Sequence, residues 1–220
     1  PGRLNPLSVK VYNPTDRPFE GDVVLVRGGV SRAGGRMHQS VYVGPFATRW
    51  VQFSPYVNSL DEWRLTWHGG RASVAVAAPK KDAPCVVLLD QGDFLTGASK
   101  LPVHPAALFP ASVSLTDALD AVVLDHAPDW SPLQEQAFLD WLYAGGALHL
   151  IKGRQGQYPA FTGGLAKLNG PLDSVAYGGG EVRRHAIDRR SLTLAGLANS
   201  GYTAPKLSTE KNGYGRMPTV

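Results

Sequence analysis

The chain has 220 residues, of which 43% are hydrophobic and 18% are charged, and its formal net charge is +4. This is an ordinary globular composition, and no apolar run approaches the ~20 residues of a membrane-spanning helix. Its basic residues form no nucleic-acid recognition motif, so we expect no nucleic-acid partner and no membrane insertion by these residues. Because the chain opens on Pro1 instead of Met, we expect it to be a fragment of a longer protein.

The first part of the chain, residues 5–78, has the pattern of short β-strands. Apolar and polar residues alternate in Trp63–Trp67, and Gly69-Gly70 marks a hairpin turn after it. About six strands at regular spacing predict an all-β sandwich, which we expect to be immunoglobulin-like. The predicted strands are Leu7–Tyr12, Asp22–Arg27, His38–Val43, Ala47–Phe53, Trp63–Trp67 and Ala72–Ala77.

A polar stretch between two prolines, Pro79–Pro84, separates this region from the rest and is the predicted linker. We therefore expect a β-sandwich domain at residues 1–79 and a second domain at residues 80–220, with a loose tail at Pro205–Val220. The single cysteine, Cys85, excludes an intramolecular disulfide and opens an apolar strand, where we expect a small buried side chain.

A β-α-β unit organises the second domain. Ala121–Leu124 is a short apolar run typical of a buried strand, and Ser131 with Gln134 forms the pattern of a helix N-cap and capping box. Gly145-Gly146 ends the helix, and Ala147–Ile151 is the next strand. We also expect strands at Cys85–Asp90 and Glu181–Ile187, a weak strand at Ala111–Leu115 and a short helix within Pro102–Pro110.

Residues 85–187 resemble the class I glutamine amidotransferase-like fold. The resemblance lies in Val86–Asp90, in Ala118–Leu124 and in Trp141–Leu150, where a helix ends in Gly-Gly before an apolar strand. It implies an α/β flavodoxin-like domain, as found behind a β-sandwich in bacterial membrane-anchored proteins. It also implies an extracytoplasmic location on the periplasmic side, with any anchor in a segment outside these residues.

The resemblance does not extend to a catalytic nucleophile. In amidotransferases a cysteine stands on the turn after the strand that corresponds to Ala147–Ile151, whereas this chain has Lys152-Gly153-Arg154 there. No Cys or Ser lies between Ala144 and Gly170. We therefore expect no catalytic residues, no cofactor and no enzyme activity. The preferred function is an interaction or scaffold module that binds protein partners or the rest of its own chain.

Polar residues follow the predicted strands at the edge where open α/β sheets bind ligands. They are Asp90, Asp93, Asp125, His126 and Asp129. Carboxylates and an imidazole there indicate a polar-ligand or metal site, and would suit a hydrolase. The alternative is that they cap helices and turns. We name Asp90, Asp125, His126 and Lys152 as candidate ligand-binding residues and expect no tightly bound metal.

Two further features have alternative interpretations. Lys152 could be an amine nucleophile or an anion contact, but a solvent-facing lysine at a strand end is the favoured interpretation. The aromatic residues of the sandwich, Trp50, Tyr56, Trp63 and Trp67, could form a carbohydrate-binding platform. Trp63 and Trp67 share one face of a strand, and such pairs are more often part of a core.

Overall fold

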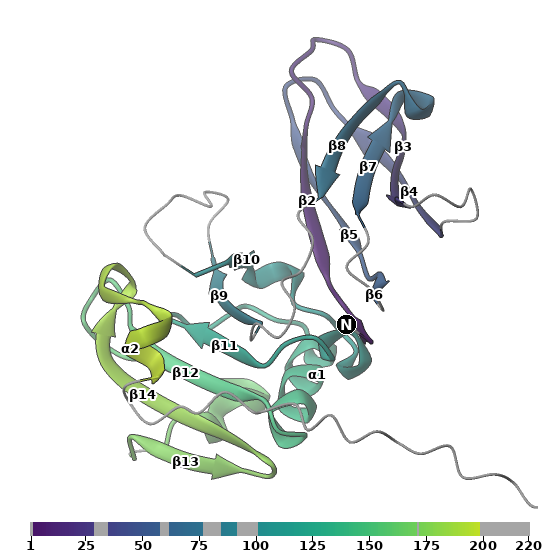
Figure 1. Ribbon diagram of the computed structural model, residues 1–220. Coiled ribbons are helices and arrows are strands. Elements are labelled where there is room, and N and C mark those ends of the chain that lie inside the picture. Colours follow the sequence, from purple (N-terminus) through teal and green to yellow (C-terminus); the bar gives the residue numbers. More distant parts are fainter. Residues whose placement is uncertain are drawn as a thin grey trace, which may run out of the picture.

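A computed structural model describes residues 2–28, 35–57, 62–76, 85–91, 101–170 and 172–198. Figure 1 shows two groups of strands, the first from the N-terminal part of the chain and the second, with the main helix, from the C-terminal part. The predicted linker Pro79–Pro84 and the predicted tail Pro205–Val220 lie outside the described residues. The proposed division at residues 79 and 80 therefore stays a prediction.

The described N-terminal strands are all paired antiparallel. They are β1 (Arg3–Leu4), β2 (Leu7–Tyr12), β3 (Phe19–Arg27), β4 (Arg36–Val43), β5 (Thr48–Phe53), β6 (Tyr56–Val57), β7 (Trp63–Trp67) and β8 (Ala72–Val76). A four-stranded sheet has the order β4-β3-β7-β8, while β2 pairs with β5 and β1 pairs with β6. The described N-terminal strands therefore form three small antiparallel sheets.

The core of this region lies between the β2-β5 pair and the four-stranded sheet. Val23 and Leu25 on β3, Phe53 on β5 and Leu65 on β7 are all buried in one cluster. Each alternates with more exposed neighbours, because successive side chains of a strand point to opposite faces. The buried Asn13 closes one end by donating from Nδ2 to the carbonyl oxygen of Val43 at 3.1 Å.

The C-terminal part is built on one six-stranded sheet of order β10-β9-β11-β12-β14-β13. Five strands are parallel, and the edge strand β13 is antiparallel to β14. The elements are β9 (Val86–Asp90), β10 (Val103–Pro105), β11 (Ala121–Leu124), α1 (Pro132–Tyr143), β12 (Ala147–Lys152), β13 (Ser174–Tyr177), β14 (Gly180–Asp188) and α2 (Leu194–Ala198).

The local sequence signals around α1 are confirmed. Ser131 caps the helix, and the capping box with Gln134 is formed in both directions. Trp141 is buried against the sheet and donates from Nε1 to the carbonyl oxygen of Leu119 at 2.9 Å. A side chain at Gly146 would run into the ring of Trp141, so the chain needs glycine here to turn into β12. Leu133, in the first turn of the helix, is exposed.

The expected fold class, an α/β flavodoxin-like domain behind an immunoglobulin-like sandwich, is wrong. Strands dominate the described residues, in antiparallel and mixed sheets. A flavodoxin-like domain needs helices on both faces of its sheet, but among the described residues α1 is the only α-helix longer than five residues. The N-terminal strands divide into three sheets instead of the two that make an immunoglobulin sandwich.

The physical reason lies in the connections between strands. In the described residues they contain short 3₁₀ turns at Ala106–Leu108, Val113–Thr116 and Gly163–Leu168. Prolines and glycines flank these segments and disfavour a longer helix. The predicted strand at Ala111–Leu115 is consequently replaced by a 3₁₀ turn. The segment Pro102–Pro110, predicted to hold a short helix, holds the strand β10 followed by a 3₁₀ turn.

None of the described helices combines the length and apolar character needed to cross a bilayer.

Two polar side chains, Arg3 and Gln52, join the N-terminal strands to the C-terminal part. The guanidinium of Arg3 donates to Asp120 Oδ1 at 3.2 Å and to the carbonyl oxygen of Asp117 at 3.1 Å. Gln52 donates from Nε2 to the carbonyl oxygen of Leu108 at 2.8 Å. These contacts hold β1 and β5 against the turns that precede β11.

Candidate functional site

The strand-end residues predicted from the sequence meet at one edge of the C-terminal sheet. Asp90 is the last residue of β9, and Asp125 directly follows β11. The two strands are parallel neighbours, with Val123 opposite Leu88, so their carboxyl ends lie side by side. Both carboxylates are largely buried. The sequence placed these residues at strand ends but did not show that the strands were adjacent.

A third residue, Arg189, joins the two carboxylates. Its Nη1 donates to Asp90 Oδ1 at 2.8 Å. Its Nε and Nη2 donate to the two oxygens of Asp125 at 2.8 and 3.0 Å, which is the bidentate geometry that guanidinium and carboxylate favour. Arg189 begins a 3₁₀ turn after β14, and the Asp188 side chain fixes this turn by accepting from the Ser191 backbone N–H at 3.0 Å.

The protonation states follow from this geometry. Burial acts to raise the pKa of Asp125, but hydrogen bonds from His126 and Arg189 outweigh it, and the pKa is lowered. Burial acts to lower the pKa of Arg189, but its bonds to Asp125 and Asp90 raise the pKa overall. Asp125 therefore acts as an anion bound to an internal cation. The sequence analysis did not single out Arg189, because no local pattern links residues that are 64 positions apart in the chain.

His126 completes the cluster. Its Nδ1 lies 2.8 Å from Asp125 Oδ1, which fixes the ring and leaves Nε2 as the second nitrogen. That Nε2 is buried and has no hydrogen-bond partner among the described residues. Asp93, another residue predicted at this edge, lies outside the described residues. Asp129 is exposed on the loop before α1.

The cluster is not arranged as a set of metal ligands. The Arg189 guanidinium is ion-paired with both the Asp90 and the Asp125 carboxylates, in the place where a divalent cation would be needed. Within the part of the chain that the structure describes, no group of three or more His, Cys, Asp or Glu side chains is arranged to hold a metal ion. The chemistry that this edge offers is an internal salt-bridge network with one additional imidazole.

Lys152, the remaining candidate ligand-binding residue, makes no hydrogen bond or ion pair with this cluster. It is the last residue of β12, where a bulge shifts the register so that Lys152 lies opposite Asp188. Its ammonium has no hydrogen bond or ion pair with any described residue. The next residue, Gly153, is tightly enclosed, since a Cβ there would lie 2.6 Å from the carbonyl oxygen of Asp125. Position 153 of the turn after β12 therefore has no room for a side chain.

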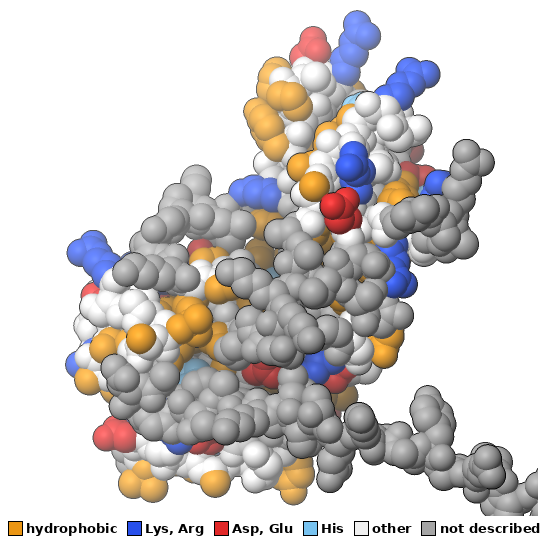
Figure 2. Space-filling model, viewed as in Figure 1, with side chains coloured by type: hydrophobic (Ala, Val, Ile, Leu, Met, Phe, Trp, Pro, Cys, Tyr) orange, Lys and Arg blue, Asp and Glu red, His pale blue; other side chains and the backbone are white. Residues whose placement is uncertain are grey.

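A second candidate site lies between the sheets of the N-terminal region. It is a groove of about 640 Å³, lined by apolar side chains that include Val9 and Val11 of β2, Leu65 of β7 and Val74 of β8. Val74 is 50% exposed although it stands opposite Leu65, which is almost completely buried. The apolar face of the four-stranded sheet is therefore uncovered toward β8. Figure 2 shows hydrophobic side chains on the surface of the N-terminal region, gathered mostly at its upper end.

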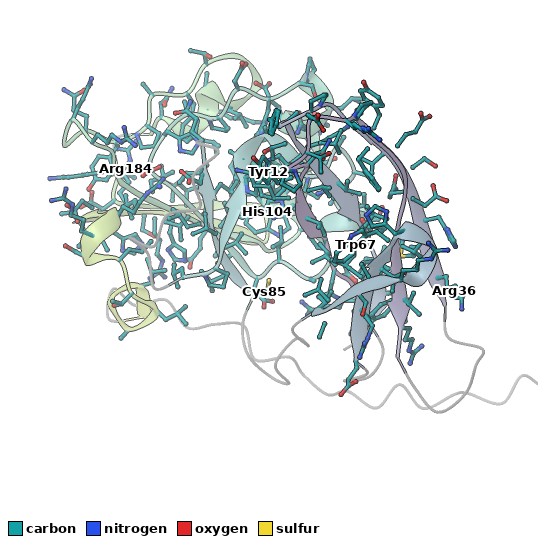
Figure 3. The ribbon with its side chains drawn as sticks, turned by 90° about the horizontal axis from the view of Figure 1, so that it is seen from above. Tyr12, Arg36, Trp67, Cys85, His104 and Arg184 are labelled. Atoms are coloured by element: carbon teal, nitrogen blue, oxygen red, sulfur yellow. The ribbon has the colours of Figure 1, made fainter. Side chains whose placement is uncertain are left out.

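Polar and aromatic residues form the rim of this groove. Tyr12, 57% exposed, stands at the end of β2, and Trp67 stands at the end of β7. Trp67 also borders a second hollow, which lies on the outer face of β3 and β4 and is lined by Arg36 as well. In the view from above, Trp67 lies between Tyr12 and Arg36 (Figure 3). His68, with a φ of 52°, contacts Phe19 edge-on with 5.2 Å between ring centres.

The four aromatic residues considered as a carbohydrate platform are not brought together. Trp63 is buried in the core, and Lys10 covers Trp50 with its ammonium 5.7 Å from the ring centre. Tyr56 stands on β6, in a different sheet, so Trp67 is the only one of the four that borders the groove. The sequence pattern shows which side chains share a face of each strand. The strand order determines which of these faces is left uncovered by another strand.

Comparisons with known proteins add little to this geometry. No family model matches the chain, and no curated protein matches it. One similar solved structure is the cycloisomaltooligosaccharide glucanotransferase of Paenibacillus sp., in complex with cycloisomaltoheptaose. It shares 15% identity over 66% of this chain, with a TM-score of 0.27, and this chain matches 25% of that enzyme's length. A likeness of this degree establishes neither a common fold nor a common activity.

Proposed function

We propose that this chain is a non-enzymatic interaction module that binds an apolar protein segment in the groove between β2 and β8. The observation that carries the proposal is the half-exposed Val74, which continues a core face otherwise buried at Leu65 and Val23. Apolar surface that is continuous with a core and open to solvent is typical of an interaction site. The partner is another protein or a further part of the same protein.

The strand-end cluster supports a structural role for the C-terminal part. Arg189 links the turn after β14 to the ends of β9 and β11, so it ties three strands of the sheet together. Both carboxylate partners are already ion-paired with Arg189, whose positive charge would repel a metal ion. The closed turn at Gly153 agrees with a domain that positions a binding surface and carries out no reaction.

The location of the protein stays a prediction. An extracytoplasmic place within a larger bacterial membrane-associated protein was implied by the resemblance to amidotransferase-like domains, and no observation on the structure bears on it. Fractionation of cells that produce the full-length protein, followed by detection of these residues with an antibody, would decide it. Recovery with the cytosol would contradict this proposal without affecting the groove.

The binding proposal is tested by selection of a displayed library of random short peptides on the purified chain. We expect enriched peptides to bind the unmodified chain and to lose affinity about tenfold or more with Val74→Glu, because the substitution places a charge in the apolar groove. Ser73→Glu is the matched control, since Ser73 is the neighbouring residue of β8 and points to the opposite face. Absence of enrichment, or equal losses in both variants, would contradict the proposed function.

One observation favours a hydrolase as the second candidate. The Asp125–His126 hydrogen bond leaves the imidazole Nε2 without a partner among the described residues, which is the arrangement of a general base. A panel of chromogenic esters and phosphoesters tests this candidate. Turnover that disappears in His126→Gln but persists in the exposed-site variant His38→Gln would make the hydrolase the leading function. We expect no such turnover.

A further inference from the structure

We infer that the occupant of the groove is an extended peptide strand that pairs with the free edge of β8. This inference rests on the proposed function and specifies its partner, an unstructured segment with apolar side chains at alternate positions. Such a segment would continue the four-stranded sheet as a fifth strand and turn one face into the groove. The mode of binding is main-chain pairing for affinity with side-chain pockets for selectivity.

The first support is the edge itself. β8 ends the order β4-β3-β7-β8, and among the described strands it pairs with β7 alone. Edge strands are commonly protected from further pairing by charges, prolines or bulges. β8 has the sequence Ala-Ser-Val-Ala-Val, with neither charge nor proline, and its pairing with β7 runs without a register shift. Its outer edge therefore presents a regular row of backbone donors and acceptors.

The second support is the groove beside this edge. Val74 points to the same face as its partner Leu65, and this face packs toward Val9 and Val11 on β2. A strand added to β8 would place every second side chain over this apolar floor, since strand side chains alternate in direction. The five residues of β8 correspond to about 17 Å of extended chain, so a partner segment of similar length would cover the edge.

The geometry disfavours other occupants. Facing sheets are separated by about 10 Å, which accommodates the side chains of an added strand, whereas a helix with its side chains is itself about 10–12 Å wide. The opposite edge strand, β2, carries Lys10, whose ammonium lies over Trp50. A charged residue is one of the usual means of blocking an edge, so β8 is the strand that remains available.

The experiment uses the 220-residue chain and a defined probe, the capped heptapeptide Ac-KVTVSVK-NH2, which alternates valine with polar residues. Two analogues carry backbone N-methyl groups, one on the three valines and one on the intervening Thr and Ser and the last Lys. Successive amides of a strand point to opposite edges, so only one of these two sets can pair with β8. Fluorescence anisotropy measures affinity, and hydrogen exchange detected by mass spectrometry measures protection of residues 72–76.

We expect the unmodified peptide to bind and one methylated analogue, but not the other, to lose affinity about tenfold or more. Saturating peptide should slow exchange of the β8 amides, while β13, the edge strand of the C-terminal sheet, stays unchanged as an internal control. Val74→Glu should abolish both effects, and Ser73→Glu should preserve them. A scrambled peptide with three consecutive valines should bind more weakly, because its side chains cannot all face the groove.

Three outcomes would overturn the inference. Equal binding of both methylated analogues without protection of β8 would mean that the groove holds its partner without strand addition, and the proposed interaction function would stand. Protection of β8 that grows with protein concentration in the absence of peptide would identify a second copy of the chain as the occupant. No binding of any heptapeptide at millimolar concentration would remove the strand partner, while the library selection would still decide whether the groove binds peptides at all.

Discussion

Arg189 holds Asp125 through two parallel hydrogen bonds, from Nε to Oδ2 at 2.8 Å and from Nη2 to Oδ1 at 3.0 Å. The two residues are 64 positions apart in the chain, and the pairing joins the turn after β14 to the end of β11. Asp90, at the end of β9, accepts a third bond from the same guanidinium. The sequence suggests a cation site at Asp90 and Asp125, but both carboxylates are thus already paired with a cation of the same chain, Arg189.

The first prediction follows from this pairing. Calorimetric titration of the unmodified chain with zinc, magnesium or manganese should show no binding stronger than about 0.1 mM, because the guanidinium is already paired with both carboxylates and would repel a cation. Arg189→Ala should lower the free energy of unfolding by roughly 2–4 kcal/mol, since it leaves Asp90 and Asp125 buried without a counter-charge. Arg190→Ala, an exposed residue of the same turn, is the control and should change it by less than about 0.5 kcal/mol. Micromolar metal binding by the unmodified chain that is abolished in Asp125→Asn would contradict this view.

The sequence predicted those features whose cause is local. The capping box at Ser131, the stop at Gly145-Gly146 and the strands of the β-α-β unit all depend on residues within a few positions of one another, and they are present. Asp90 and Asp125 were placed at strand ends by the same kind of reasoning. The pairing with Arg189 depends on strand order across the sheet, which no local pattern contains.

The errors have a common origin as well. The α/β fold class was implied by a resemblance that supposed helical crossovers, whereas the proline- and glycine-rich connections form 3₁₀ turns. The strand β13 was missed because Ser174–Tyr177 is short and only partly buried. The open groove was not foreseen, since alternation in Trp63–Trp67 reveals an apolar face but not whether another strand covers it.

A second prediction concerns packing of α1. Trp141 is 5% exposed, and its ring packs against Phe138 with 5.3 Å between ring centres. Trp141→Ala should destabilise the chain by roughly 3–5 kcal/mol in urea unfolding, because it creates a cavity and removes the bond to the Leu119 carbonyl oxygen. Leu133→Ala on the same helix should change stability by less than about 0.5 kcal/mol, since Leu133 is 69% exposed. Similar losses for both variants would refute the orientation of the helix.

A third prediction uses the buried histidine pair on β12 and β14. His149 Nδ1 lies 2.9 Å from His185 Nε2, so one ring donates to the other and both are neutral. Burial, then the nearby His185 and Arg183, lowers the pKa of His149 to about 3. Burial also lowers the pKa of His185, with Arg183 acting in the same direction and Glu181 in the opposite one. The pair is therefore a neutral unit whose protonation opposes folding.

The sign of its effect on stability follows from linkage. Between pH 6.5 and about 3 the unfolded chain binds a proton at His149 that the folded chain does not, so stability falls as the pH is lowered through this range. From pH 6.5 to pH 4 the loss from this residue should be about 3 kcal/mol. His149→Gln should remove that part of the pH dependence in urea unfolding, and the exposed His38→Gln should leave it intact. Equal pH profiles for the unmodified chain and His149→Gln would show that the pair does not control acid stability.

The last prediction concerns glutaminase chemistry, which requires a reactive thiolate. Burial, followed by repulsion from Asp120, raises the pKa of Cys85 to about 11, so its thiol is protonated at neutral pH. Cys85 also precedes β9, whereas the strand end at which a nucleophile would stand is occupied by Lys152-Gly153. Gly153 is enclosed by the Asp125 carbonyl oxygen and has no room for a side chain. Ammonia release from glutamine, followed by a coupled glutamate dehydrogenase assay, should therefore be at background level and identical in the unmodified chain and Cys85→Ala. Turnover that is present in the unmodified chain and lost in Cys85→Ala would show that this thiol is catalytic and would overturn the non-enzymatic proposal.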